Sequence, residues 1–269
     1  MLGGGVAPDA MEVEAFIARW RMSEGAERAS FPSFISEFCE LLRTDRPQPP
    51  TSDAEAVAYR FEYPVKLSGP DGTGTTGRID LYRKRCFVME AKQSRLKGQP
   101  KEILPAGSSG EEPSAAPRGR AGADRGLDVM MLNAKRQAEQ YCRALPASHG
   151  WPPFIILCDV GHCFEFYADF SGQGKNYAQF PDRHRFRVYL EDLRDPAIRA
   201  WMTRIWSDPI SLDPSRQAAL ATRQIAQRLA LVSKALERRH DPEDVALFLM
   251  RCVFTMFAED VRLIQIGRA

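Results

Sequence analysis

Residues 77–93 read GRIDLYRKRCFVMEAKQ, and this stretch decides the fold. β-favouring runs cover residues 77–82 and 86–91, and three consecutive cations separate them. This pattern predicts two strands joined by a basic turn, which consists of Arg83, Lys84 and Arg85. Residues 59–67 form an earlier β-favouring run, followed by a glycine-rich segment, so the three runs together predict a strand meander.

The chemistry of this hairpin rests on Asp80, Glu90 and Lys92. Side chains alternate along a strand, so Glu90 and Lys92 share one face. With the turn centred on Lys84, residue 80 opposes residue 88, and Asp80 lies diagonal to Glu90 with about 7–8 Å between the backbones. Two carboxylates at that separation can share a divalent ion, and we expect Asp80, Glu90 and the carbonyl of Ala91 to hold Mg²⁺. Lys92 would then orient or activate the attacking water and offset charge on a phosphate.

A plainer interpretation also fits the spacing. Asp, Glu and Lys on one hairpin face can form a solvated surface with an ion pair worth about 0–1 kcal/mol. The apolar neighbours of Glu90 in the run VMEAK favour a buried carboxylate instead, and burying an acid without a purpose is costly. Gln137 and Tyr141 are spaced i and i+4 on a predicted helix, where the glutamine could contact phosphate or water. The candidate DNA-binding residues are Arg83, Lys84, Arg85 and Gln93.

Around this segment the chain alternates between helical and strand patterns. Apolar spacing predicts two helices within residues 12–43, broken near residues 30–32. Residues 94–126 hold almost nothing that could occupy a core, which predicts a flexible insertion. The remaining expected elements are a helix at 127–145, strands at 154–160 and 163–167, and helices at 197–206, 217–238 and 242–266, the last two with Asp at the N-cap followed by Pro.

Composition restricts the functional class. The 269 residues are 44% hydrophobic and 27% charged, so the chain can bury a core. Lys and Arg number 37 against 35 Asp and Glu, and the net charge of +2 means that any nucleic-acid site must be local. Since the sequence shows neither a signal peptide nor an apolar span, and its six cysteines lack repeated CxxC pairs, we expect a protein of the bacterial or archaeal cytoplasm with reduced thiols.

The order of these motifs resembles a known family. Asp80, Glu90, Ala91 and Lys92, followed by a helix with Gln137, resemble the PD-(D/E)XK nuclease core. More closely, RIDLYRKRCFVMEAKQSRLKG and the helical FLMRCVFTMFAEDVRLI resemble the amino-terminal region of MmeI-like (type IIL) restriction-modification enzymes. Such enzymes fuse an endonuclease, a helical connector, an adenine-N6 methyltransferase and a target recognition domain. Ile79 stands where the nuclease core often has Pro.

The resemblance implies an α/β (α+β) fold, with a restriction-endonuclease-like mixed sheet flanked by helices and followed by an all-α spacer. The implied domains are a PD-(D/E)XK endonuclease at residues 1–192 and a helical spacer at 193–269 that leads to an absent methyltransferase. The implied activity is Mg²⁺-dependent hydrolysis of double-stranded DNA, with Mn²⁺ as a substitute, as in a type II restriction endonuclease. The resemblance maps metal binding onto Asp80 and Glu90 and catalysis onto Lys92.

Partners and cofactors follow from the same resemblance. DNA is the substrate, the parent polypeptide supplies the methyltransferase and recognition domains, and a dimer is expected during cleavage. S-adenosylmethionine would bind only the missing methyltransferase, because this chain has neither a Gly-rich cofactor loop nor an Asn-Pro-Pro-aromatic motif. The alternative is a catalytically silent nuclease-like module that docks onto a methyltransferase.

Two questions stay open in the sequence. A further acid is common in this fold, and the candidates are Glu37, Glu40 and Glu62. The residues Cys158, His162 and Cys163 are of types that bind zinc, but they lack a second ligand pair, and we interpret them as part of a strand–turn–strand.

Overall fold

The computed structural model describes residues 8–22, 27–49, 58–68, 74–92 and 118–260. The chain forms two compact units, Met1–Leu212 and Asp213–Ala269. The helices are α1 (Ala10–Arg21), α2 (Glu27–Leu41), α3 (Arg118–Ala144), α4 (Pro196–Ser207), α5 (Pro214–Leu236) and α6 (Pro242–Asp260). The strands are β1 (Tyr59–Ser68), β2 (Gly74–Arg83), β3 (Phe87–Lys92), β4 (Phe154–Asp159), β5 (Cys163–Ala168), β6 (Ala178–Gln179) and β7 (Arg187–Tyr189).

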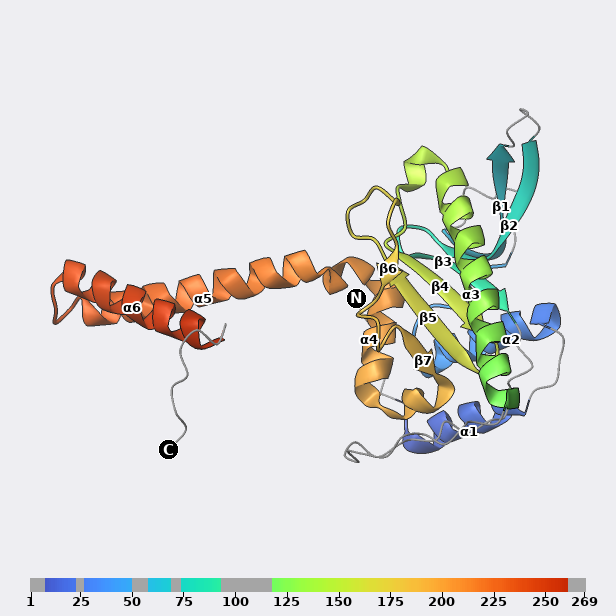
Figure 1. The fold of residues 1–269 in the computed structure, drawn as a ribbon, viewed down its shortest axis with the longest axis horizontal. Helices are drawn as coiled ribbons and strands as arrows, with labels where there is room; N and C mark the ends of the chain where they lie inside the picture. The colour runs from blue at the N-terminus through green and yellow to red at the C-terminus, as the bar shows by residue number, and fades with distance from the viewer. Residues whose placement is uncertain (1–7, 23–26, 50–57, 69–73, 93–117, 261–269) are drawn as a thin grey trace. The chain divides into compact units, whose positions relative to one another are not determined.

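One mixed sheet organises the first unit (Figure 1). Its strand order is β1-β2-β3-β4-β5-β6, and β7 pairs with β5. The β3–β4 pair is parallel and the other pairs are antiparallel. The parallel pair requires a crossover, which passes through α3. The fold class predicted from the sequence, a mixed sheet flanked by helices and followed by helices, is confirmed.

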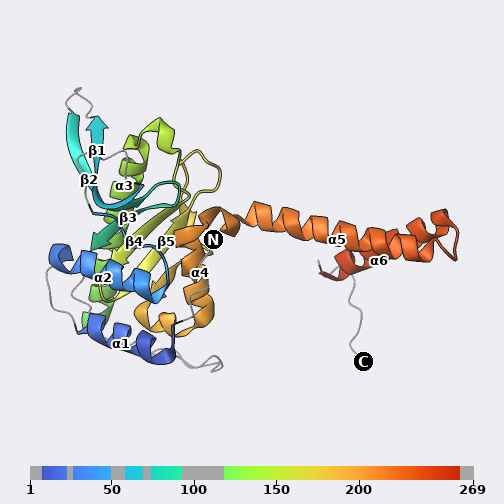
Figure 2. The same cartoon turned by 180° about the vertical axis from the view of Figure 1, so that it is seen from behind.

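Helices α1, α2 and α4 cover one face of the sheet (Figure 2). Phe34 and Phe38 of α2 stack against Phe164 of β5, with ring centroids 5.7 and 4.9 Å away. Trp206 of α4 packs 4.8 Å from Phe87 of β3, and its indole N–H donates to the Tyr59 hydroxyl at 3.2 Å. These aromatic contacts place α4 in the first unit, whereas the sequence assigned residues 193–269 to a spacer.

Helix α3 covers the opposite face (Figure 1). Its apolar residues at three- and four-residue spacing are buried with side chains from the sheet. The helix contributes Leu127, Met131, Ala134, Ala138 and Tyr141, and the sheet contributes, among others, Tyr82, Val88, Ile155 and Leu157. Because alternate residues of β3 face opposite ways, Glu90 and Lys92 lie on the face that α3 covers.

Two boundaries predicted from the sequence were wrong. The break between the first helices follows Met22 rather than residues 30–32, and Pro32 lies inside α2. Burial of Phe31, Phe34 and Ile35 offsets the backbone hydrogen bond that Pro32 cannot donate. Helix α3 begins at Arg118, so residues 118–126 of the expected insertion are helical, because they continue a helix whose residues from Leu127 onward pack on the sheet. Residues 94–117 of that insertion lie outside the described residues.

Helices α5 and α6 form the second unit. Both begin as expected, with Asp213 accepting from the Ser215 N–H at 2.9 Å and Asp241 accepting from the Glu243 N–H at 2.9 Å. Apolar side chains remain exposed on α6, including Phe248, Phe254 and Phe257 at 57, 66 and 59%. None of the helices that the structure describes is long and apolar enough to cross a membrane.

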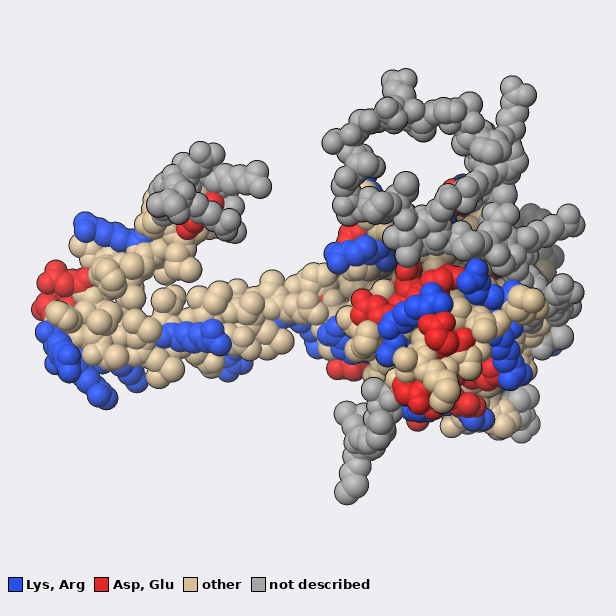
Figure 3. All heavy atoms as spheres, turned by 90° about the horizontal axis from the view of Figure 1, so that it is seen from below, with Lys and Arg blue, Asp and Glu red and all other residues tan. Residues whose placement is uncertain are grey.

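Charges are mixed on the first unit. Figure 3 shows Lys and Arg interspersed with Asp and Glu over the described part of the face in view, so neither sign fills it. Ion pairs on this unit include Arg43 with Glu12 at 2.7 Å and Arg194 with Glu14 at 2.5 Å. This face agrees with the balanced charge of the sequence and offers no continuous basic track for a polyanion.

Candidate active site

The register of β2 and β3 determines where Asp80 lies along the hairpin relative to Glu90. Leu81 pairs with Met89, Tyr82 with Val88 and Arg83 with Phe87, and Asp80 and Glu90 are the next residues beyond this paired stretch. The diagonal arrangement predicted from a turn centred on Lys84 was therefore wrong. The turn is centred on Arg85, whose φ of 62° lies in the left-handed region. Residue 80 is therefore not opposite residue 88, and Asp80 and Glu90 each lie one residue beyond the Leu81–Met89 pair.

Asp80 is hydrogen-bonded to β3, the strand that contains Glu90 and Lys92. Its Oδ2 accepts the backbone N–H of Ala91 at 2.8 Å. A residue in a strand directs its N–H and its carbonyl to the same neighbouring strand, so the Ala91 carbonyl also lies on the β2 side. Asp80 thus lies against Ala91, the residue between Glu90 and Lys92, and the metal ligation of Asp80, Glu90 and Ala91 stays a prediction.

Glu90 and Lys92 form the buried part of this site. Glu90 is 0% exposed, and the Nζ atom of Lys92 lies 3.9 Å from its Oε2. Taking a carboxylate out of water costs several kcal/mol, and a nearby cation recovers only part of that cost. Lys92 keeps a quarter of its side chain exposed, so its ammonium can also reach a ligand from solvent. An all-oxygen donor set beside a lysine fits a hard cation such as Mg²⁺.

Gln137 is positioned through Tyr141. Its Nε2 donates to the Tyr141 hydroxyl at 3.0 Å, which links the two residues that the i, i+4 spacing placed on one helix face. The Tyr141 ring lies on β2 at Gly77, where a Cβ would stand 2.6 Å from the ring carbon Cε1. Only glycine permits this approach, so α3 lies close to the strand that carries Asp80.

The basic turn lies apart from the acids. Arg83 donates to Asp45 at 3.1 Å and stacks 4.7 Å over the Tyr59 ring, with 17% of its side chain exposed. The turn is at one end of β3 and Lys92 at the other, about 17 Å away at 3.3 Å per residue. The sequence interpretation placed Arg83, Lys84 and Arg85 at the turn beside Asp80, and this turn lies at the opposite end of β3 from Lys92. Gln93, the fourth DNA-binding candidate, lies outside the described residues.

The candidates for a further acid now differ in position. Glu37 accepts from the Trp20 indole at 2.8 Å and pairs with Arg19, and Glu40 pairs with Arg46. Both belong to α2, on the sheet face away from Glu90. Glu62 instead lies in β1 between the pairs Phe61–Leu81 and Tyr63–Ile79 that flank Asp80, has a φ of 51°, and lies 3.8 Å from Arg78. The register makes Glu62 the candidate nearest in the sheet to Asp80.

Sequence reasoning missed a buried polar network on the same face. Glu165 is 1% exposed and accepts from Arg187 Nε at 2.7 Å and from the Tyr167 hydroxyl at 2.8 Å. Arg187 also donates to Asp128 of α3 at 2.6 Å. Although burial lowers the pKa of Arg187, its bonds to Asp128 and the charge of Glu165 raise that pKa above its usual value. Arg187 thus fixes α3 to β5, and no local motif signals a contact between residues so far apart in the chain.

Comparison with known proteins gives one match. A family model, described as the MmeI N-terminal domain, matches residues 8–239. No curated protein and no solved structure matches the chain. The matched residues contain the sheet, α3 and the position at which Asp80, Glu90 and Lys92 meet. The chain belongs to the MmeI N-terminal domain family, a family associated with restriction enzymes.

Proposed function

We propose that this chain is a Mg²⁺-dependent DNA endonuclease module of a fused restriction-modification enzyme. The observation that carries the proposal is how β2 meets the end of β3: Asp80 Oδ2 accepts the Ala91 N–H at 2.8 Å, and Lys92 Nζ lies 3.9 Å from Glu90 Oε2. Family membership supports the restriction-enzyme context. When bound, Mg²⁺ would polarise the scissile phosphate and lower the pKa of a water molecule.

The chain's own residues have distinct tasks in this proposal. Asp80, Glu90 and the Ala91 carbonyl would hold the cation, and Mn²⁺ offers a similar preference for oxygen ligands. Lys92 would donate to the attacking water or to a phosphate oxygen, where its charge offsets the charge that develops. Gln137 would orient the substrate from α3, held in place by Tyr141.

The remaining parts of the proposal come from the family. Double-stranded DNA is the substrate, and methyltransferase and target recognition domains elsewhere in the parent polypeptide deliver it. S-adenosylmethionine belongs to that methyltransferase domain. Cleavage of both strands needs two catalytic centres, which a dimer would supply during cutting.

A second candidate function is a silent docking module. It is favoured by the exposed apolar side chains of α6, since Phe248, Phe254 and Phe257 each leave more than half of their surface in solvent. Contiguous exposed apolar surface of this kind usually marks a contact with another protein. In this case Asp80 and Glu90 would have a structural role and no catalytic one.

The test is cleavage of supercoiled plasmid by the purified chain in Mg²⁺, in Mn²⁺ and in EDTA. Asp80→Asn and Lys92→Ala should each lower metal-dependent cutting by about 10²–10³-fold, the usual loss for a group that stabilises the reacting charge. Lys66→Ala is the matched control, because Lys66 is exposed on β1 and should cut like the parent. Equal cutting by Lys92→Ala and the parent would refute the assignment.

Thermal unfolding separates the two candidate functions when cutting is weak. A working metal site should raise Tm on addition of Mg²⁺ or Mn²⁺, because a ligand that binds only the folded state stabilises it. Asp80→Asn should lose this rise. A folded chain that neither cuts DNA nor gains stability from either ion is the silent module.

A further inference from the structure

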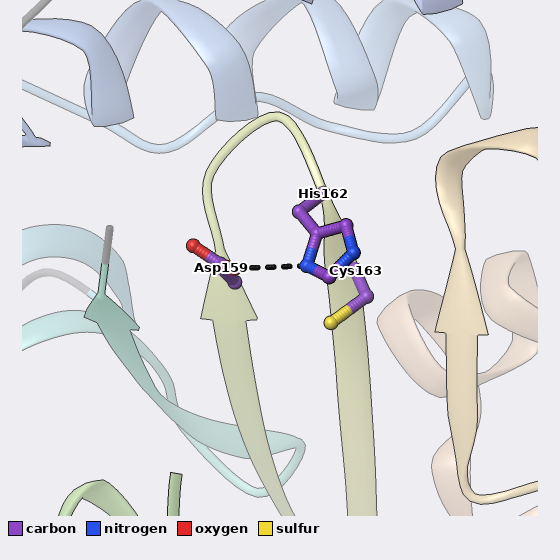
Figure 4. Close-up of side chains that lie close together, drawn as sticks. All are labelled: Asp159, His162 and Cys163. Atoms are coloured by element: carbon purple, nitrogen blue, oxygen red, sulfur yellow. Dashed lines mark hydrogen bonds and ion pairs between the residues drawn. The ribbon is translucent and has the colours of Figure 1, made fainter. Parts of the chain in front are cut away.

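A second cluster of metal-ligating side chains lies at the hairpin between β4 and β5. Asp159 ends β4, His162 is in the turn and Cys163 begins β5 (Figure 4). One ligand atom from each residue lies within 4.8 Å of the others. The sequence interpretation considered Cys158 with His162 and Cys163, but the hairpin pairs Asp159 with Cys163 and so brings an acid into the group instead.

The backbone of this hairpin is fixed on several sides. Val160 N–H donates to the Lys92 carbonyl at 3.0 Å, His162 N–H to the Asp159 carbonyl at 2.9 Å, and Leu190 N–H to the His162 carbonyl at 3.1 Å. Gly161 has a φ of 81°, which closes the turn. The His162 ring packs edge-on to the Tyr189 ring with centroids 5.4 Å apart. The three side chains are therefore held in place before any ligand arrives, which lowers the entropic cost of binding.

The chemistry of the three groups is suited to a cation. The Asp159 carboxylate and the Cys163 thiol are both 0% exposed, and His162 Nδ1 lies 3.0 Å from Asp159 Oδ2. Burial, together with the nearby charge of Asp159, raises the pKa of Cys163 well above its usual value. A carboxylate, an imidazole and a thiolate are all groups that bind a divalent transition ion. His162, with 16% of its side chain exposed, offers a path from solvent.

We propose that Asp159, His162 and Cys163 form a binding site for a soft divalent transition ion, with Zn²⁺ the expected occupant. Thiolate and imidazole ligands select zinc over Mg²⁺, whereas the Asp80–Glu90 site has only oxygen donors. Tetrahedral zinc with bonds of about 2.0–2.3 Å separates its ligand atoms by roughly 3.5 Å, so small side-chain movements close the site. Three protein ligands leave a fourth position for water.

Cobalt is the probe, because a Co²⁺–thiolate bond gives a near-ultraviolet charge-transfer band. The full chain, stripped with EDTA and kept reduced, should bind one Co²⁺ per chain with this band, and Zn²⁺ should displace it. Cys163→Ser should lose the band. Cys158→Ser is the matched control, since Cys158 is equally buried but belongs to the core on the other sheet face, and it should retain the band.

A second variant covers the risk that Cys163→Ser unfolds. His162→Gln changes a partly exposed turn residue, and it should keep the parent's Tm in EDTA while losing most of the rise that Zn²⁺ produces. Asp80→Asn should keep both the band and the Zn²⁺ effect, so failure of the nuclease proposal leaves this result unchanged. Absence of a thiolate band in the parent, or its persistence in Cys163→Ser, would overturn the zinc site and leave a structural hydrogen bond between Asp159 and His162.

Discussion

Arg187→Met should destabilise the fold by about 3–4 kcal/mol at pH 7. The substitution leaves Glu165, 1% exposed, without its cation, and breaking a buried pair in this way typically costs about 3–5 kcal/mol. Asp128 contributes little, because its side chain is 62% exposed and exposed pairs are worth about 0–1 kcal/mol.

Urea denaturation followed by tryptophan fluorescence measures this loss. With a slope of about 2–3 kcal/mol per molar urea, the midpoint should fall by about 1–2 M in Arg187→Met. Asp128→Asn is the matched control, since it removes the other partner of the same arginine, and its midpoint should change by less than about 0.5 M.

Two results would contradict this reasoning. If Asp128→Asn and Arg187→Met were equally destabilising, the exposed ion pair of Arg187 with Asp128 would contribute as much to stability as the buried pair with Glu165. A loss of less than about 1 kcal/mol in Arg187→Met would also contradict it, because a buried carboxylate that loses its cation should cost more than an exposed ion pair.

Three further predictions concern other parts of the chain. Gly77→Ala should cost about 1–3 kcal/mol, because its Cβ would stand 2.6 Å from the Tyr141 ring, whereas Gly74→Ala meets its nearest atom at 4.0 Å and should keep the parent's Tm. Burial raises the pKa of Cys142 from 9.0 to about 12, so the thiol loses its proton at lower pH in the unfolded chain than in the folded one. The free energy of unfolding should therefore fall by about 1.4 kcal/mol per pH unit between these two values. Urea denaturation at several pH values should show a shallower fall in Cys142→Ala, and an equal slope would exclude Cys142 as the cause. Phe254→Gln should reduce self-association in size-exclusion chromatography at high concentration, since the ring is 66% exposed on α6, and unchanged elution would argue against an adhesive surface there.

Local patterns in the sequence were sufficient for most of the fold. Alternating and continuous apolar runs predicted β1 to β5 to within about three residues of their observed ends, because each run lies within one short continuous segment of the chain. Asp at the N-cap before Pro located α5 and α6 for the same reason. The register of the β2–β3 hairpin was missed, since Arg85 adopts a left-handed φ without the glycine or asparagine that usually signals it.

Spacing identified the acids and lysine of the candidate site, because Asp80, Glu90 and Lys92 belong to one hairpin. Contacts between distant segments had no such signal. The bond from Arg187 to Asp128 spans 59 positions, and the Arg187 bond to Glu165 spans 22. Pro32 was misjudged because packing of Phe34 and Ile35 outweighs the local cost of proline in a helix. In both cases the structure depends on packing between segments that are distant in the sequence, and a local sequence pattern does not reveal such packing.

The parallel pairing of β3 with β4 has a consequence for the order of folding. Asp80 and Glu90 approach each other when the β2–β3 hairpin closes over about ten residues. Strand β4 pairs with β3 only when a connection of roughly sixty residues, which includes α3, has closed. The longer closure costs about 1.5 kcal/mol more in chain entropy. Hairpins form in about 1–10 μs, ahead of such long-range pairings. In the nascent chain the two carboxylates therefore meet while still in water, and docking of α3 later removes Glu90 from solvent.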